Sequence, residues 1–200
     1  MEKRYLSKYS GSPSVVMGFH GCTQEVAEQV INHGEHLSSS NNDYDWLGPG
    51  IYFWESNPLR ALEWAQKKYA ESGKTPAVVG AFIDLGHCLN LLNSEGLIEL
   101  RDAYEFLKYF SRDTGQAIPA NTVGENGFDL LNRRLDCAVV RAAHQIREME
   151  NELPYDTVRG VFWEGQDLYE NAGFKEKNHI QISVLNPSAI LGYFRPLYQP

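Results

Sequence analysis

The sequence predicts a single α+β domain over residues 1–200. Five short apolar runs have the length of β-strands, and segments with helical spacing of apolar residues lie between them. Of the 200 residues, 42% are hydrophobic and 12% aromatic, which is enough apolar surface for a packed core. No repeat, low-complexity tract or linker divides the chain. We therefore expect one domain in which helices are inserted between strands.

Composition excludes several classes of protein. The formal net charge is −8, so the chain as a whole does not attract nucleic acid or anionic lipid, although a local basic groove remains open. The longest apolar stretches are too short to span a membrane, and the N-terminus has no apolar signal core. Cys22, Cys88 and Cys137 are widely spaced, which predicts neither a disulfide framework nor a zinc site. We expect a cytoplasmic protein with no membrane partner and no metal.

The first two elements are a strand and a helix. Residues 15–20 form an apolar run that ends at His20. Thr23 can cap the helix that follows, because its hydroxyl accepts a free amide of the first turn, and Gly34 can end that helix. The expected apolar stripe of this helix consists of Val26, Val30 and Ile31.

A loop, a strand and a second helix follow. Residues 37–50 are rich in Ser, Asn, Asp, Gly and Pro, yet they include Tyr44, Trp46 and Leu47, so we expect this loop to fold over another part of the protein. Residues 50–54 are the second strand. Asn57 and Pro58 then predict the cap and first residue of a helix that ends near residue 73. Its apolar positions are Leu59, Leu62 and Tyr69.

The rest of the chain contains three strands and two helices. Residues 77–85 are almost continuously apolar, as in a buried central strand, and the run continues into residues 89–92. Residues 158–163 and 179–184 are the last two predicted strands. Side chains of residues 179–184 alternate between the two faces of the sheet, so Gln181 points away from the side that buries the isoleucines. Helical spacing marks one helix by Leu97, Leu100, Tyr104 and Leu107, and a longer one by Leu131, Leu135, Ala138, Ala142, Ile146 and Met149.

Two glycine-containing motifs carry the functional signal. Phe19-His20-Gly21-Cys22-Thr23 and Gly48-Pro49-Gly50-Ile51-Tyr52-Phe53 each place a glycine where the backbone of a strand can approach a ligand. His20 and Tyr52 are flat side chains that donate and accept hydrogen bonds. Together the motifs predict a site for a flat polar ring such as nicotinamide.

Four segments in order resemble the poly(ADP-ribose)-polymerase-like ADP-ribosyltransferases. His20-Gly21-Cys22 is similar to the family's His-Gly-Ser/Thr element, and residues 48–53 are similar to its Gly-x-Gly-Ile-Tyr-Phe element. Residues 79–86 resemble the strand that follows, and residues 179–190 resemble the final strand, which presents the third active-site residue. The resemblance implies a split mixed β-sheet with inserted helices, and NAD as co-substrate.

The resemblance also implies roles for individual residues. His20 is expected to hold the ribose side of NAD, Gly21 the nicotinamide carboxamide through its backbone, and Tyr52 to stack on the nicotinamide ring. Trp64 is the candidate for the opposite wall, where the family usually has a tyrosine. Cys22 and Phe53 complete the two motifs and are counted with the NAD-binding residues, Cys22 as a stand-in for a small hydroxyl residue and not as a nucleophile.

Gln181 stands where the family has a catalytic glutamate, which is a departure from its pattern. A glutamine can still accept a hydrogen bond from a ribose hydroxyl, but it carries no negative charge and cannot take a proton from the acceptor. Gln181 therefore favours transfer of a single ADP-ribose over chain elongation. Glu164 and Glu176, just upstream, are alternative sources of the carboxylate.

The expected function is NAD-dependent mono-ADP-ribosylation of a macromolecular acceptor, either protein or nucleic acid. The small size resembles bacterial members that act as toxins under the control of an antitoxin protein, or in defence against phage. Three alternatives stay open: an NAD glycohydrolase, a non-catalytic module that binds NAD or ADP-ribose, and a domain in which His20 and Tyr52 only pack.

Overall fold

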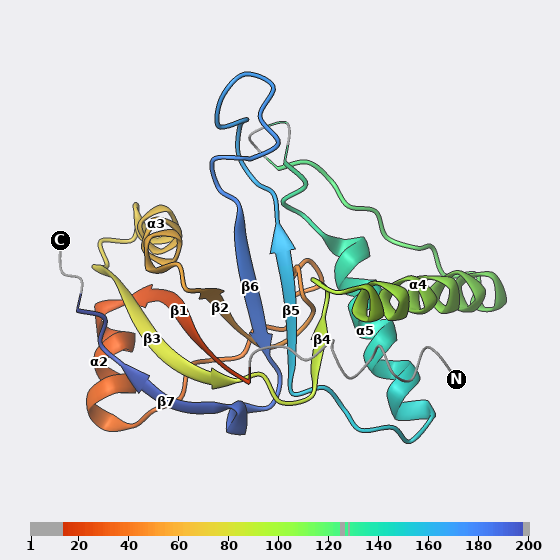
Figure 1. The fold of residues 1–200 in the computed structure, drawn as a ribbon, viewed down its shortest axis with the longest axis horizontal. Coiled ribbons are helices and arrows are strands. Elements are labelled where there is room, and N and C mark those ends of the chain that lie inside the picture. Colours follow the sequence, from red (N-terminus) through yellow and green to blue (C-terminus); the bar gives the residue numbers. More distant parts are fainter. Residues whose placement is uncertain (1–13, 125–126, 128, 198–200) are drawn as a thin grey trace.

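The computed structural model describes residues 14–124, 127 and 129–197, and in this part of the chain it is an α+β fold (Figure 1). One open mixed sheet has the strand order β4-β5-β6-β2-β1-β3-β7, in which only β4 and β5 are parallel neighbours. The strands are β1 (Val15–Thr23), β2 (Ile51–Glu55), β3 (Pro76–Asp84), β4 (Cys88–Asn90), β5 (Thr157–Phe162), β6 (His179–Val184) and β7 (Ile190–Phe194). The helices are α2 (Gln24–His33), α3 (Pro58–Tyr69), α4 (Ser94–Thr114) and α5 (Arg134–Met149), and a 3₁₀ turn spans Pro187–Ala189. The predicted α+β class is confirmed.

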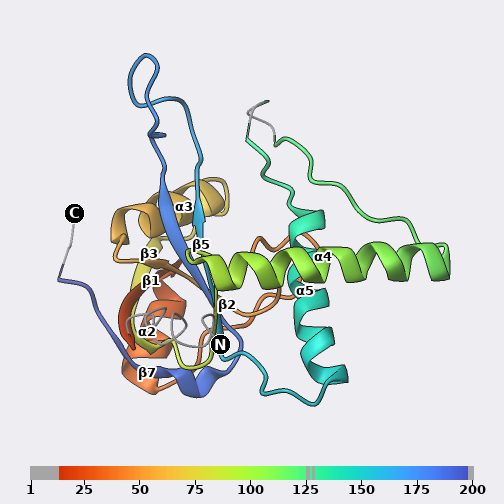
Figure 2. The same cartoon turned by 45° about the vertical axis from the view of Figure 1, so that its right-hand side comes forward.

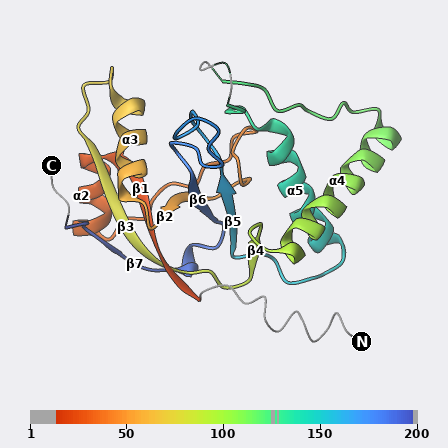
Figure 3. The same ribbon diagram turned by 45° about the horizontal axis from the view of Figure 1, so that its top comes forward.

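The helices lie at the two ends of the sheet. Helices α2 and α3 lie beside β1 and β3, and α4 and α5 lie together beside β4 and β5 (Figure 3). Helix α4 and the connection between β5 and β6 both project away from the sheet (Figure 2). Among the described helices, none is long and apolar enough to cross a membrane.

The two faces of the sheet have different cores. One face carries Phe53, Ile182 and Val79 and packs against α2; we call it the α2 face. The other face carries Tyr52 and Val158 against α4 and α5, and Trp54 against α3. We call this second face the Trp54 face, and it includes Gln181, because Gln181 is paired with Trp54 in the register of β2 and β6.

The predicted caps of α2 and α3 are confirmed. Thr23 Oγ1 accepts the Val26 amide at 3.4 Å, and Gly34 ends α2 with a φ of 71°. Asn57 Oδ1 accepts the Arg60 amide at 3.2 Å. Helix α3 ends at Tyr69, earlier than the predicted residue 73.

The predicted apolar stripes of these helices are partly wrong. In α2 the predicted Val30 is buried together with Ala27, and in α3 the alanine Ala61 is buried, whereas the predicted Val26 and Leu59 are exposed. The reason in α3 is its closeness to β1, since a Cβ added at Gly21 would lie 2.2 Å from the Ala61 carbonyl oxygen. At this separation only small side chains fit between helix and strand.

The later elements contain further corrections. Strand β3 is buried mainly on the α2 face, and Phe82 on its other face is exposed. The run after residue 85 is not a continuation of β3, because the chain turns at Gly86 (φ 54°) and forms β4. Strand β7 was not predicted. Helices α4 and α5 are confirmed, although α5 begins at Arg134, so Leu131 precedes it, and Leu97 and Met149 are exposed.

Candidate functional site

The two motifs meet at a short junction between β1 and β2. These strands share only two residue pairs, Gly18 with Glu55 and Phe19 with Trp54, whereas β1 pairs with β3 along its whole length. Immediately beyond the last pair, His20 Nδ1 lies 2.8 Å from the Tyr52 carbonyl oxygen. The carbonyl can only accept, so Nδ1 carries the proton and Nε2 keeps its lone pair. Burial lowers the pKa of His20, which keeps the ring neutral.

Gly21 turns its backbone toward this junction. The Met17 carbonyl accepts the Ser56 amide at 2.8 Å, so the odd-numbered residues of β1 direct their backbone groups toward β2. The N–H and C=O of Gly21 therefore face β2 beyond the last recorded pair. A side chain at Gly21 would collide with α3, so this backbone can be presented only by glycine.

Tyr52 holds the loop that precedes β2. Its hydroxyl accepts the Leu47 amide at 2.8 Å and donates to the Gly48 carbonyl at 2.6 Å. Burial raises the pKa of Tyr52, so the phenol stays protonated. The expectation that the loop folds over another part of the protein is confirmed, since Leu47 is buried against Val158 and Phe162. The Tyr52 hydroxyl is engaged within the protein, which leaves its ring as the part that can meet a ligand.

Replacing Tyr52 by phenylalanine is expected to lower the free energy of unfolding by about 1–3 kcal/mol. The substitution keeps the ring but removes both partners of the hydroxyl and leaves the Leu47 amide and the Gly48 carbonyl unpaired. Urea unfolding of the variant and the wild type measures the loss. Equal unfolding midpoints would show that the hydroxyl does not hold the loop.

Gln181 is a polar residue of the Trp54 face. Its side chain is only 9% exposed, and it makes no hydrogen bond with any described residue. Trp54 flanks it on β2 and Gly160 on β5. Tyr52, paired with Ser183, lies diagonally across the same face. An amide that is nearly buried without a partner is costly unless something else binds it, which makes Gln181 the strongest candidate for ligand contact.

His179 stands two residues before Gln181 on the same face. Its ring is stacked on Phe162 and Trp46, with centroids 5.6 and 6.3 Å away, and lies 6.4 Å from the ring of Trp54. Nδ1 lies 2.6 Å from the Lys177 carbonyl, so Nε2 carries the lone pair, and Nε2 is buried without a partner. Burial lowers the pKa of His179. The positive charges of Arg60 and Arg133 lower the pKa of His179 further, and the negative charge of Glu164 raises it.

The folded protein is expected to lose stability as the pH falls below about 6.5. Because burial lowers the pKa of His179, the unfolded chain takes up a proton at this residue before the folded protein does. His179 contributes at most about 1.4 kcal/mol per pH unit to this loss, down to its folded-state pKa, and His20, whose pKa burial also lowers, contributes in the same direction. Urea unfolding between about pH 7.5 and 5.5 measures it, and a His179→Gln variant should have the shallower dependence. Equal slopes would contradict the assignment.

The predicted NAD-binding side chains do not all lie on one face of the sheet. Side chains alternate along β1 and β2, so His20 and Tyr52 leave the sheet toward opposite faces, and the His20 ring packs against Phe53 at 5.8 Å. Phe53 and Cys22 are buried in the core of the α2 face and offer no surface to a ligand. Burial raises the pKa of the Cys22 thiol to about 11, as expected of an inert cysteine. Trp64 is 36% exposed on α3, with its ring centroid 5.7 Å from that of Trp54.

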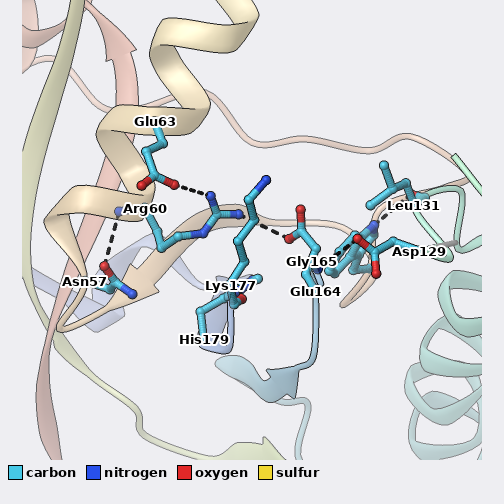
Figure 4. A network of polar contacts seen from close by, with 10 residues as sticks. Asn57, Arg60, Glu63, Asp129, Leu131, Glu164, Gly165, Lys177 and His179 are labelled. Carbon is cyan, nitrogen blue, oxygen red and sulfur yellow. Dashed lines mark hydrogen bonds and ion pairs between the residues drawn. The ribbon is translucent and has the colours of Figure 1, made fainter. Parts of the chain in front are cut away.

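The two alternative carboxylates lie in the connection between β5 and β6. Glu164 forms an ion pair with Arg60 of α3 at 3.2 Å, near His179 (Figure 4). Glu176 is exposed, and its carboxylate accepts the Gln166 amide within the same connection. Of the two, Glu164 is therefore the one beside the Trp54 face.

Sequence reasoning missed three residues of this region: Trp54, His179 and Arg60. The period of two in β6 was sufficient to place His179 on the same face as Gln181, whereas Trp54 lies beside Gln181 only through the pairing of β2 with β6. No sequence signal connects Arg60 with Glu164, because 104 residues separate them.

No metal centre accompanies these groups within the described ranges, where no cluster of three His, Cys, Asp or Glu side chains could hold an ion. The residues that remain available for a cofactor are the Gly21 backbone, His20 Nε2, the Tyr52 ring and the Gln181 amide. No family model, no curated protein and no solved structure matches this chain.

Proposed function

We propose that this protein is an NAD-dependent mono-ADP-ribosyltransferase with the split mixed sheet of that class. The observation that carries the proposal is the Gln181 amide, nearly buried and without a partner, on the sheet face that also carries Tyr52. Two further features support it: the junction of only two residue pairs between β1 and β2, and the Gly21 backbone directed into that junction. The resemblance of the four sequence segments supplies the reaction.

In this proposal each group acts on a different part of NAD. The Gly21 N–H and C=O pair with the nicotinamide carboxamide, and the Tyr52 ring stacks on nicotinamide. The Gln181 oxygen accepts a hydrogen bond from a ribose hydroxyl on the Trp54 face, and His20 Nε2 accepts one on the α2 side of the junction. The bond between ribose C1′ and the nicotinamide nitrogen breaks, nicotinamide leaves with the bonding pair, and an acceptor nucleophile attacks C1′ and then loses its proton.

Positioning supplies most of the acceleration in this scheme. Positive charge develops on the ribose as nicotinamide leaves, and Gln181 has no charge to stabilise it. Holding the ribose and the ring in a reactive geometry can still contribute several orders of magnitude. An uncharged Gln181 suits transfer of one ADP-ribose to an acceptor that needs little activation. A toxin role with an antitoxin partner belongs to the same proposal and rests on the resemblance alone.

The test is incubation of the purified protein with NAD labelled on the adenine side, in the presence of separated protein and nucleic-acid fractions. The proposal expects label in one fraction, together with free nicotinamide, and about a hundredfold less of both from a Gln181→Ala control. Nicotinamide release without labelled macromolecule identifies a glycohydrolase. NAD binding without turnover identifies a non-catalytic module, and absence of binding means that His20 and Tyr52 only pack.

A further inference from the structure

Arg60 has a hydrogen-bonding edge that the protein uses only in part. Its side chain lies between Glu63 of the same helix and Glu164 of the connection between β5 and β6, near His179 (Figure 4). The Glu164 carboxylate contacts Nη2 alone, at 3.2 Å, and Nε is buried with no partner. Only 13% of the Arg60 side chain is exposed. The Nε–Nη2 edge is therefore held out of water with one of its two donors unpaired.

A second arginine in the same protein shows the contrast. Arg159 binds Glu55 through both Nε and Nη2, each at 2.6 Å, which is the bidentate geometry that the guanidinium group favours. Glu164 does not achieve this geometry on Arg60. The Arg60 edge thus keeps one donor that its present carboxylate partner does not use.

Trp54 supplies a second unpaired donor nearby. Its indole Nε1–H is buried without a partner, and the residue is only 5% exposed. The Trp54 ring lies against Trp64, which is one helical turn after Arg60 on the same side of α3. It also lies beside His179, whose pKa the Arg60 charge affects. Trp54 and Arg60 thus each keep a buried, unpaired N–H donor in the part of the protein around Trp64 and His179.

The start of α3 adds to the attraction for an anion. Arg60 is the third residue of this 12-residue helix, whose first turn contains no acidic residue. The aligned peptide dipoles give a helix N-terminus a partial positive charge. A ligand with three or more acceptor oxygens would satisfy the Arg60 edge and the Trp54 indole together, which a carboxylate on the protein does not.

We propose that Arg60 and Trp54 form a phosphate-binding site in which Glu164 occupies the place of the ligand. A phosphate group binds the Nε–Nη2 edge of Arg60 in bidentate fashion and accepts the Trp54 indole N–H, and the Glu164 carboxylate moves aside. The phosphate belongs either to NAD or to a nucleotide acceptor, since both present the same oxygens. Only the assignment to NAD rests on the proposed function.

The test follows the indole N–H signals of the four tryptophans by NMR during titration with inorganic pyrophosphate, with Trp54 assigned through a Trp54→Phe variant. Pyrophosphate should shift the Trp54 signal more than the other three. Arg60→Gln should weaken binding at least tenfold, and Glu164→Gln should strengthen it several-fold because the competing carboxylate is gone. Arg134→Gln is the matched control, since Arg134 is half exposed and pairs with Asp43 away from the site.

Three outcomes overturn the proposal: no shift of the Trp54 signal, equal binding by the Arg60→Gln variant, or no gain from Glu164→Gln. Circular dichroism confirms that each variant is folded. Two further titrations identify the source of the phosphate. An Arg60-dependent shift with NAD assigns the site to the co-substrate, and one with a single-stranded oligonucleotide assigns it to the acceptor. A response to pyrophosphate without any response to NAD supports the phosphate site and contradicts the proposed function.

Discussion

Replacing Glu55 by alanine is expected to lower the free energy of unfolding by about 3–5 kcal/mol. Glu55 and Arg159 form a bidentate ion pair with both distances at 2.6 Å, and the two side chains are 12% and 10% exposed. The ordinary pKa of an arginine is far above neutral pH, so the guanidinium stays charged after the substitution even though the carboxylate no longer raises its pKa. The loss is large because a nearly buried positive charge is left without its partner.

A rescue variant separates this charge effect from loss of packing. Replacing both Glu55 and Arg159 by methionine removes the two charges together and should recover most of the stability. Glu105→Gln is the control for an exposed pair, since Glu105 is 60% exposed and pairs with Lys108, and it should cost less than about 1 kcal/mol. Urea unfolding of the four proteins measures the differences. The prediction would be contradicted if Glu55→Ala lowered the free energy of unfolding no more than Glu105→Gln does.

The Glu55–Arg159 pair also explains how the candidate site is held in shape. Glu55 ends β2 and Arg159 lies in β5, so the pair crosses β6, the strand between them. Both strands that flank Gln181 are thereby connected on the α2 face, opposite the site. The Trp54 face can then keep unpaired polar groups, since the order of β5, β6 and β2 does not depend on them.

The sequence was sufficient for elements whose signals are local. Thr23 and Asn57 cap helices through their own side chains, and such contacts require only nearby residues. The period of two in residues 179–184 correctly separated Gln181 from Ile182. These features depend on a few neighbouring positions, which is why they can be read from one chain.

Features that depend on distant residues could not be predicted. The short strand β4 exists because Gly86 turns the chain and β5, about 70 positions later, provides its partner. The buried alanines of α3 depend on how closely β1 approaches the helix. For the same reason the sequence did not reveal that Tyr52 uses its hydroxyl to hold the loop at Leu47.

Replacing Gln181 by alanine is expected to reduce nicotinamide release and ADP-ribose transfer by about a hundredfold, the typical cost of removing one polar group that acts in a transition state. The same substitution should leave stability unchanged or raise it, because Gln181 makes no hydrogen bond with the described residues. Replacing a residue that serves only packing would instead lower the stability and leave the turnover of the folded protein unchanged. Parallel measurements of turnover and urea unfolding therefore distinguish a functional glutamine from a structural one.

Gln166→Ala is the matched control, because Gln166 is an exposed glutamine in the connection between β5 and β6. It should retain wild-type turnover. Full turnover by Gln181→Ala together with loss in Glu164→Ala would move the third role from β6 to the carboxylate that now pairs with Arg60. That result is physically distinct, because a carboxylate in this role would stabilise the developing positive charge on the ribose, whereas Gln181 only orients the sugar. The pair of variants thus decides between positioning and charge stabilisation as the source of the rate.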